Sequence, residues 1–298
     1  MILPAPHAVL DIAGDDGAPL RARRHGNPRG NRLIVSHGNG FAIDGYAGFW
    51  GRFLDVFEVI AVDARSHGWN PPADPPGHDY VHLARDLLRV CAAVGAEFGA
   101  KPTAGVFHSM SAQAAMLATL DTGGLLDALI CFDPPNVPPD GPARAAMLDY
   151  LDRLTRWASG RHAVFADPAE LAAEYAATRS GREWADGTAL SMARAVLRLD
   201  GECWRLCCPR ELEASMYRQG APLDLWPRGR QFPMPLKLIG ADPARAHPSP
   251  TALSNLALAE AGGFDYTAIP GTSHLLQLEA PEACAAAVRE FLEAAGLR

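Results

Sequence analysis

The sequence has no long apolar run, no excess of positive charge and no signal-peptide pattern, and each absence excludes a class of protein. A membrane-spanning helix needs about 20 consecutive apolar residues, and the chain has no such run. Nucleic-acid binding requires clustered Lys and Arg, whereas the formal net charge is −7. We therefore expect a cytoplasmic protein with a small-molecule substrate as its partner, not nucleic acid or a membrane. The sequence leaves a homo-oligomer open.

Cysteine is scarce, with six residues in a chain of 298. A chain this long and apolar does not need disulfides to be stable. The cysteines also lack the paired spacing and the nearby histidines that are typical of a metal site. The sequence therefore predicts no metal ion, and no motif calls for a cofactor.

Short apolar runs recur along the chain and are separated by turns and helical patterns. Runs of this length suit strands that are buried on both faces of a parallel sheet. Alternating strands and helices predict an α/β fold, here with a mostly parallel eight-stranded sheet flanked by helices. An antiparallel hairpin over 8–13 and 19–24 is expected to lead the sheet. The predicted central and late strands lie at 33–36, 59–62, 104–107, 128–132, 236–239 and 266–269.

The interval between Phe132 and Leu236 breaks this rhythm, because it shows helix-favouring stretches and no convincing strand. It predicts a helical cap inserted between two late strands. We expect residues 1–134 and 234–298 to form the core and residues 135–233 to form the cap. The proline-rich segments 134–139 and 227–235 are the expected entry and exit of the cap.

A serine follows the predicted strand 104–107 and opens a helix. A sharp strand-to-helix turn would hold the Ser109 hydroxyl clear of the backbone and place developing negative charge at a helix N-terminus. The usual pattern for such a nucleophile is G-x-S-x-G, whereas this chain has Phe107 and Ser111 at the flanking positions. A simple helix N-cap is the alternative interpretation of Ser109.

Ser36-His37-Gly38-Asn39-Gly40-Phe41 follows an earlier strand and is rich in glycine. Acyl transfer needs two N–H donors for the oxyanion of the tetrahedral intermediate. The main-chain N–H groups of Asn39 and Met110 are the candidates. An ordinary glycine-rich turn is the alternative, and His37 is expected to brace this loop.

A histidine and several acids follow the later strands. His274, after the last strand, could accept the proton of Ser109 as general base. Such a base needs a carboxylate to orient it. Asp242, just after the next-to-last strand, is the favoured acid and Asp133 is the alternative, while Asp265 begins a strand and is less suitably placed.

Together these stretches resemble the α/β-hydrolase superfamily, in which the order along the chain is Ser, acid, His. Asp63-Ala64-Arg65-Ser66-His67-Gly68 is similar to the D-x-R-G-H-G turn of the family. His37-Gly38-Asn39-Gly40-Phe41 resembles an H-G-x-G-F subgroup that includes peroxisomal-lipase-like esterases. Two features depart from the family pattern: Phe107 replaces a glycine, and Asp242 lies two residues after Gly240 where many relatives show three.

The resemblance implies a serine hydrolase that cleaves a carboxylic ester with a small or medium apolar acyl group through an acyl-enzyme. Carbon–carbon bond hydrolysis, lactone opening and amide cleavage on the same triad are alternatives, since fold alone does not separate them. The alternative from another functional class is a protein that binds a ligand but turns it over very little. The presence of Phe107 in place of the usual glycine favours this alternative. The aromatic residues of the cap could bind substrate, or they could instead pack the cap onto the sheet. The candidate substrate-binding residues are Phe41, Phe107, Trp157, Trp184, Trp204 and Leu275.

Overall fold

A computed structural model describes residues 4–72, 77–124, 126–226 and 232–298. Within these ranges an eight-stranded main sheet is antiparallel in its first two pairings and parallel in the others, which confirms the predicted fold and the leading hairpin. Its strands in spatial order are β1 (Ala8–Ala13), β2 (Pro19–Gly26), β4 (Glu58–Val62), β3 (Arg32–Ser36), β5 (Thr103–His108), β6 (Ala128–Phe132), β10 (Leu236–Ala241) and β11 (Asp265–Ile269).

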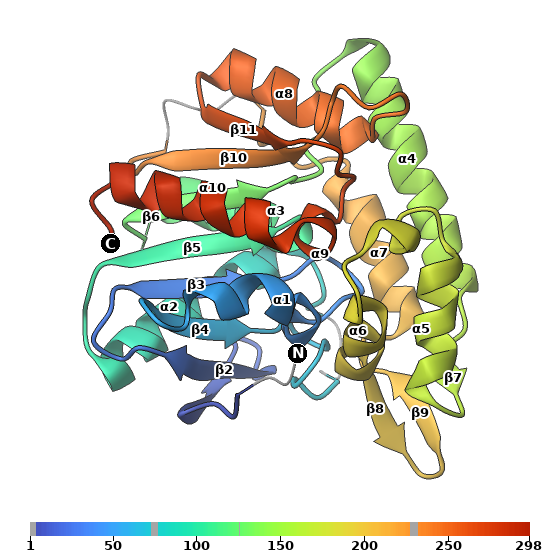
Figure 1. Ribbon diagram of the computed structural model, residues 1–298, viewed down its shortest axis with the longest axis horizontal. Helices are drawn as coiled ribbons and strands as arrows, with labels where there is room; N and C mark the ends of the chain where they lie inside the picture. The colour runs from blue at the N-terminus through green and yellow to red at the C-terminus, as the bar shows by residue number, and fades with distance from the viewer. Residues whose placement is uncertain (1–3, 73–76, 125, 227–231) are drawn as a thin grey trace.

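The central strands are buried on both faces, as their continuous apolar runs predict. Neighbouring residues of one strand enter opposite clusters: Leu33 packs on one side of the sheet and Ile34 on the other. The cluster of Leu33 includes side chains of α1 (Ala47–Trp50), α9 (Leu276–Glu279) and α10 (Pro281–Ala294). The cluster of Ile34 includes side chains of α2 (Tyr80–Phe98), α3 (Met110–Thr122) and α8 (Pro250–Gly262). Figure 1 shows these helices covering the two faces of the sheet.

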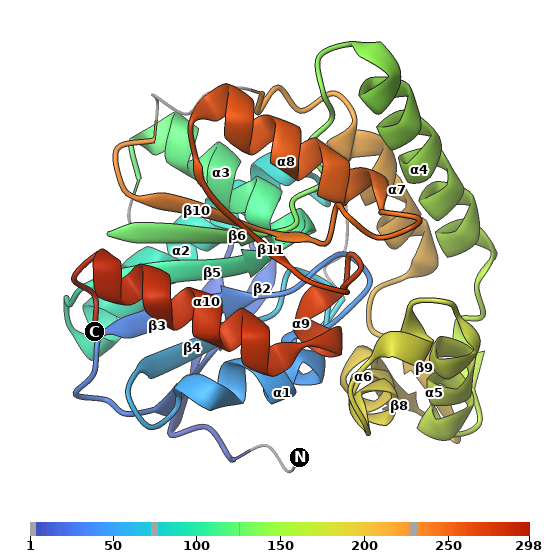
Figure 2. The same cartoon turned by 45° about the horizontal axis from the view of Figure 1, so that its top comes forward.

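The elements between β6 and β10 lie beyond the carboxyl edge of the parallel strands, to the right in Figures 1 and 2. They include a three-stranded antiparallel sheet among the described residues, so the expectation of a purely helical insertion is wrong. The elements are α4 (Gly141–Gly160), β7 (Val164–Phe165), α5 (Pro168–Ala177), η3 (Gly181–Glu183), α6 (Thr188–Val196), β8 (Leu197–Asp200), β9 (Cys203–Leu206) and α7 (Arg210–Gly220).

The hairpin of β8 and β9 explains why this part of the prediction failed. Asp200 pairs with Cys203, so the loop between the strands has two residues, and Gly201 takes a φ of 64°. A glycine at the first position of a two-residue loop favours a hairpin, but β8 begins at Leu197, directly after α6 ends at Val196, so the sequence shows no separate strand before the loop. Part of the expected exit segment, residues 227–231, lies outside the described residues.

Two 3₁₀ helices connect the sheet to the region of the cap. η1 (Ile43–Tyr46) and η2 (Gly51–Phe53) flank α1. Tyr46 and Trp50 are fully enclosed, and the Trp50 indole donates to the Ile43 carbonyl at 2.8 Å. Tyr46 contacts the loop 37–41, because its hydroxyl accepts the Gly38 N–H at 3.4 Å and its ring packs edge-on against Phe41. No helix among the described residues has both the length and the apolar character needed to cross a bilayer.

Candidate active site

Ser109 occupies the turn between β5 and α3, in a backbone conformation that is rare for residues other than glycine. Its φ is 52°, and Met110 begins the helix directly after it. The Ser109 N–H donates to the Phe132 carbonyl at 2.9 Å, and the Gln113 N–H donates to the Ser109 carbonyl at 3.1 Å. These bonds hold the turn, so that the Ser109 hydroxyl points away from the helix and does not cap it.

His274 lies within hydrogen-bonding distance of this hydroxyl. The distance from Ser109 Oγ to His274 Nε2 is 3.0 Å, and that from His274 Nδ1 to Asp133 Oδ2 is 2.7 Å. With Nδ1–H donating to the carboxylate, Nε2 is free to accept the serine proton. The structure therefore brings together Ser109, His274 and an acid from three loops that are distant in sequence.

The acid at this position is Asp133 and not Asp242, which corrects the preference drawn from the sequence. Asp242 lies on the surface, where its carboxylate accepts the N–H groups of Ala244 and Gly271, both at 2.8 Å. These bonds lower its pKa and brace the loop that carries His274. Asp265 pairs instead with Lys237, at 3.0 Å.

Asp133 is completely buried, and its carboxylate accepts hydrogen bonds from four groups. Besides His274, its carboxylate accepts hydrogen bonds from the Ala241 N–H at 3.1 Å, the Thr251 hydroxyl at 2.5 Å and the Asn255 amide at 3.1 Å. Four donors hold this buried carboxylate in one orientation and satisfy its acceptor sites. Sequence reasoning named Asp133 only as the alternative, because Thr251 and Asn255, in α8, show no pattern that links them to it.

A second histidine, His108, supports the first. Its Nε2–H donates to the His274 carbonyl at 2.9 Å, and its Nδ1 accepts from the Tyr46 hydroxyl at 2.9 Å. Burial, with a smaller contribution from the nearby His274, holds the pKa of His108 well below its usual value, so the ring is neutral. His108 thus fixes the main chain of the loop on which His274 lies.

The proposed oxyanion donors come from two segments that meet at Ser109: Met110 follows it in the chain, and an added Cβ at Gly38, the residue before Asn39, would lie 3.3 Å from Ser109 Cβ. Among the hydrogen bonds of the described residues, the main-chain N–H groups of Asn39 and Met110 have no partner. Met110 is the first residue of α3, where the N–H lacks an intrahelical acceptor. His37 braces the loop of Asn39, because its Nδ1 lies 2.8 Å from the Gly38 carbonyl and its Nε2 accepts the Ala64 N–H.

A cavity of about 520 Å³ opens over Ser109 and His274, which both line it. Four of the candidate substrate-binding residues line it as well: Phe41, Trp157, Trp184 and Leu275. Its wall also contains aromatic and cationic side chains that sequence reasoning did not select, because they are scattered along the cap and the segment after β10: Tyr150, Tyr175, Tyr217, Arg153, Arg179, Arg245 and His247.

Phe107 and Trp204 do not line this cavity, contrary to expectation. Phe107 is fully buried in the cluster of α2, α3 and α8, because alternation along β5 directs its side chain to that face. Its ring lies over Gly105, where an added Cβ would come within 2.3 Å of it. Phe107 therefore does not narrow the space beside the nucleophile. Trp204, in β9, pairs with Phe165 of β7 and packs against the hydrophobic core.

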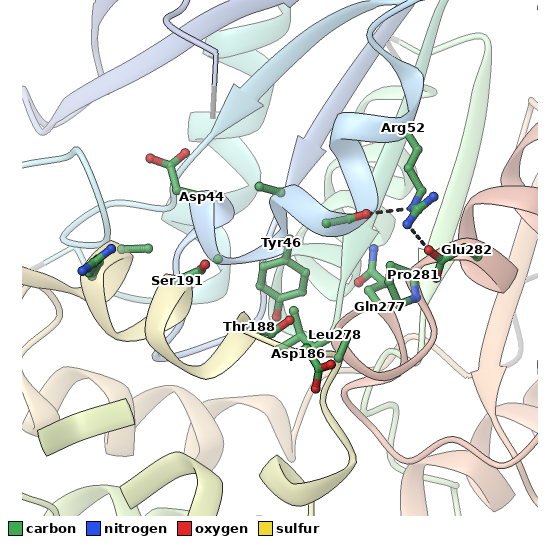
Figure 3. Close-up of a pocket in the computed structure, with 17 residues that line it drawn as sticks. Asp44, Tyr46, Arg52, Asp186, Thr188, Ser191, Gln277, Leu278, Pro281 and Glu282 are labelled. Carbon is green, nitrogen blue, oxygen red and sulfur yellow. Dashed lines mark hydrogen bonds and ion pairs between the residues drawn. The ribbon is translucent and has the colours of Figure 1, made fainter. Parts of the chain in front are cut away.

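A second cavity, of about 440 Å³, lies between α1, α6 and α9 (Figure 3). The polar side chains of its wall include Asp44, Asp186 and the ion pair of Arg52 and Glu282. Neither Ser109 nor His274 lines it. Among the described residues, no group of three His, Cys, Asp or Glu side chains is placed to hold a metal ion.

Comparison with known proteins agrees with this geometry. A family model described as the alpha/beta hydrolase family matches residues 33–287. This chain belongs to the α/β-hydrolase family. A curated relative of this α/β-hydrolase, 1H-3-hydroxy-4-oxoquinoline 2,4-dioxygenase from Pseudomonas putida, is 30% identical over an alignment of 233 residues, and the match covers 71% of this chain and 84% of the relative.

Solved structures show the same fold. E-2-(acetamidomethylene)succinate hydrolase is 20% identical to this α/β-hydrolase, with a TM-score of 0.77 over 96% of this chain and 100% of that chain. A thermophilic esterase from Thermogutta terrifontis is 18% identical, with a TM-score of 0.67 over 97% of this chain and 99% of that chain. At these identities the likeness concerns the fold, and function is argued from the site.

Proposed function

We propose that this α/β-hydrolase cleaves carboxylic esters through an acyl-enzyme on Ser109. The observation that carries the proposal is the 3.0 Å approach of Ser109 Oγ to His274 Nε2 at the floor of a cavity large enough for a substrate. A hydroxyl, an imidazole and a buried carboxylate in this order are the groups that nucleophilic acyl transfer requires. The membership in the H-G-x-G-F subgroup and the cytoplasmic location stay predictions from the sequence.

The reaction follows from the contacts. Ser109 Oγ attacks the ester carbonyl while His274 Nε2 takes its proton, and Asp133 stabilises the imidazolium that forms. The N–H groups of Asn39 and Met110 would bind the oxyanion, and one such donor is typically worth about 3 kcal/mol of transition-state stabilisation. His274 then gives the proton to the leaving alcohol and activates the water that hydrolyses the acyl-enzyme.

The cavity walls favour a substrate with a flat, apolar part. Phe41, Tyr175 and Trp184 form a mutually packed aromatic group, with ring centroids 5.3–6.2 Å apart. Aromatic walls bind planar apolar groups by area and by ring geometry. The volume of about 520 Å³ fits a small or medium substrate.

A series of p-nitrophenyl esters of increasing acyl length, with lactones and anilides of matched size, tests this proposal. We expect ester turnover that is greatest for acyl groups filling the cavity, with kcat lost in Ser109→Ala. Turnover of lactones or anilides but not esters would move the assignment to another bond on the same triad. Hydrolysis that Ser109→Ala retains would overturn the proposal.

A second candidate function is dioxygenation of a hydroxylated N-heteroaromatic compound, and the observation that favours it is the relative from Pseudomonas putida. In that case His274, oriented by Asp133, would take the proton of the substrate hydroxyl, and the reaction would consume dioxygen. An oxygen electrode with 1H-3-hydroxy-4-oxoquinoline separates the two. Dioxygen uptake that persists in Ser109→Ala but not in His274→Ala would support the dioxygenase and contradict the esterase.

A further inference from the structure

A buried ion pair in the region between β6 and β10 has no part in the triad. Arg161 Nη1 lies 3.0 Å from Glu213 Oε2, and the two side chains are only 5% and 2% exposed. Arg161 directly follows α4, and Glu213 lies in the first turn of α7. Removing two charges from water is costly, so the neighbours of this pair show what it holds in place.

On one side the pair meets the oxyanion loop. The Asn39 side-chain amide donates to the Glu213 carbonyl at 2.8 Å. Gly40 has a φ of 74°, and an added Cβ there would come within 2.3 Å of Glu213 Oε1. The glycine thus lets the Glu213 carboxylate rest directly on the loop, and both the main chain and the side chain of residue 213 touch it.

On the other side the pair meets the substrate cavity. Arg161 Nη2 donates to the Tyr175 hydroxyl at 3.2 Å, and the guanidinium lies over the Trp157 ring, 4.9 Å from its centroid. Tyr175 and Trp157 both line the cavity, and Tyr175 also packs against Phe41 of the oxyanion loop. The Arg161 guanidinium therefore contacts both the cavity wall, at Trp157 and Tyr175, and Glu213. Glu213 in turn supports Asn39.

We propose that Arg161 and Glu213 are positioning residues, which couple the wall that binds substrate to the placement of the Asn39 N–H in the oxyanion hole. The inference rests on the proposed function, in which that N–H stabilises the oxyanion. An oxyanion donor acts only within about 2.7–3.1 Å of the developing charge, and a misplacement of about 1 Å can cost about 100-fold in rate. The ion pair of Arg161 and Glu213 would keep the Asn39 N–H within this distance of the oxyanion. Substrate bound against Trp157 and Tyr175 would in turn keep the ion pair in position.

Two variants test the coupling. Glu213→Gln keeps the shape of the side chain and the main-chain contact but removes the charge. The double variant Arg161→Met with Glu213→Leu removes both charges and leaves no unpaired ion, so it should fold even if the single variant does not. The matched control is Arg156→Met, which breaks the exposed ion pair of Arg156 and Asp152 on the same helix, α4.

We expect both test variants to lower kcat per titrated active site by about 10- to 100-fold, with KM within about threefold of wild type and the control unchanged. Amide hydrogen exchange should accelerate in a peptide covering residues 37–42 and stay unchanged in a peptide covering the start of α3. An unchanged kcat per active site with unchanged exchange at 37–42, or an effect on KM alone, would overturn the proposal. If wild type turns over no ester, the proposed function fails, and the exchange of residues 37–42 still decides whether the pair holds the loop.

Discussion

Ser109 and Asp133 both adopt a positive φ, of 52° and 42°, although neither is glycine. Such a conformation costs on the order of 1–3 kcal/mol and persists only where the surroundings impose it. The two residues are joined through strand β6, since the Ser109 N–H donates to the carbonyl of Phe132, the residue before Asp133. Ser66, in the turn after β4, is the third non-glycine residue with a positive φ among the described residues, so two of these three strained positions belong to the triad.

The roles of the two acids give the first prediction. Asp133→Asn leaves the size unchanged but removes the charge that orients His274 and stabilises its protonated form. We expect kcat to fall by about 10⁴-fold. Asp242→Asn should change kcat by less than about tenfold, because its carboxylate accepts main-chain N–H groups, those of Ala244 and of Gly271 in the loop before His274, and does not contact the imidazole. Steady-state kinetics with one ester measures both, and a larger loss at Asp242 would contradict the assignment.

At the scale of elements, the turn from β5 into α3 is formed without the usual glycine two residues before the serine. Phe107 occupies that position, and Gly105, two residues earlier on the same face of the strand, leaves the space that its ring fills. The two residues therefore act as a complementary pair.

This pairing predicts a non-additive pair of substitutions. Gly105→Ala should lower the free energy of unfolding by about 1–3 kcal/mol, because its Cβ overlaps the Phe107 ring in a packed core. Adding Phe107→Leu should recover much of that loss. Urea unfolding of the two single variants and the double variant gives the coupling. Strictly additive effects would show that the ring does not depend on the glycine.

The elements also show which residues of the site can be predicted from the sequence alone. Ser109 and His274 were predictable, because each follows a strand with a recognisable turn and their order along the chain is specific. The acid was not, because Asp133 and Asp242 follow β6 and β10, which are neighbours in the sheet, so both lie at the same edge. The choice depends on Thr251 and Asn255, which long-range packing places around Asp133. The buried contact of Arg161 with Glu213 is equally non-local.

At the scale of the whole molecule, four histidines besides His108 are buried in the neutral state. Burial, the largest cause in each case, lowers the pKa of His25 and His37 to about 4 and that of His67 and His78 to about 3. The unfolded chain binds these protons near pH 6.5 and the folded chain only near pH 3–4. Their effect is absent above about pH 6.5, and they destabilise the fold progressively as the pH falls toward 4.

His25→Phe tests this linkage, since neither ring nitrogen of His25 has a hydrogen-bond partner among the described residues. In wild type the free energy of unfolding should fall as the pH is lowered from 6 to 4.5. Removing one such group should make this fall smaller by about 1 kcal/mol per pH unit. Chemical denaturation at several pH values measures the slope. The exposed His162, replaced by Phe, is the control and should leave the slope unchanged. An equal slope in His25→Phe and wild type would show that His25 does not contribute.

The contacts described above predict one chemical property: the Ser109 hydroxyl, at the floor of the larger cavity, is a nucleophile. Intact-mass spectrometry after treatment with a fluorophosphonate measures it most directly. We predict one adduct per chain, located on Ser109, formed slowly in Asp133→Asn and absent in Ser109→Ala. An unlabelled wild-type chain, or an adduct that persists in Ser109→Ala, would contradict the account.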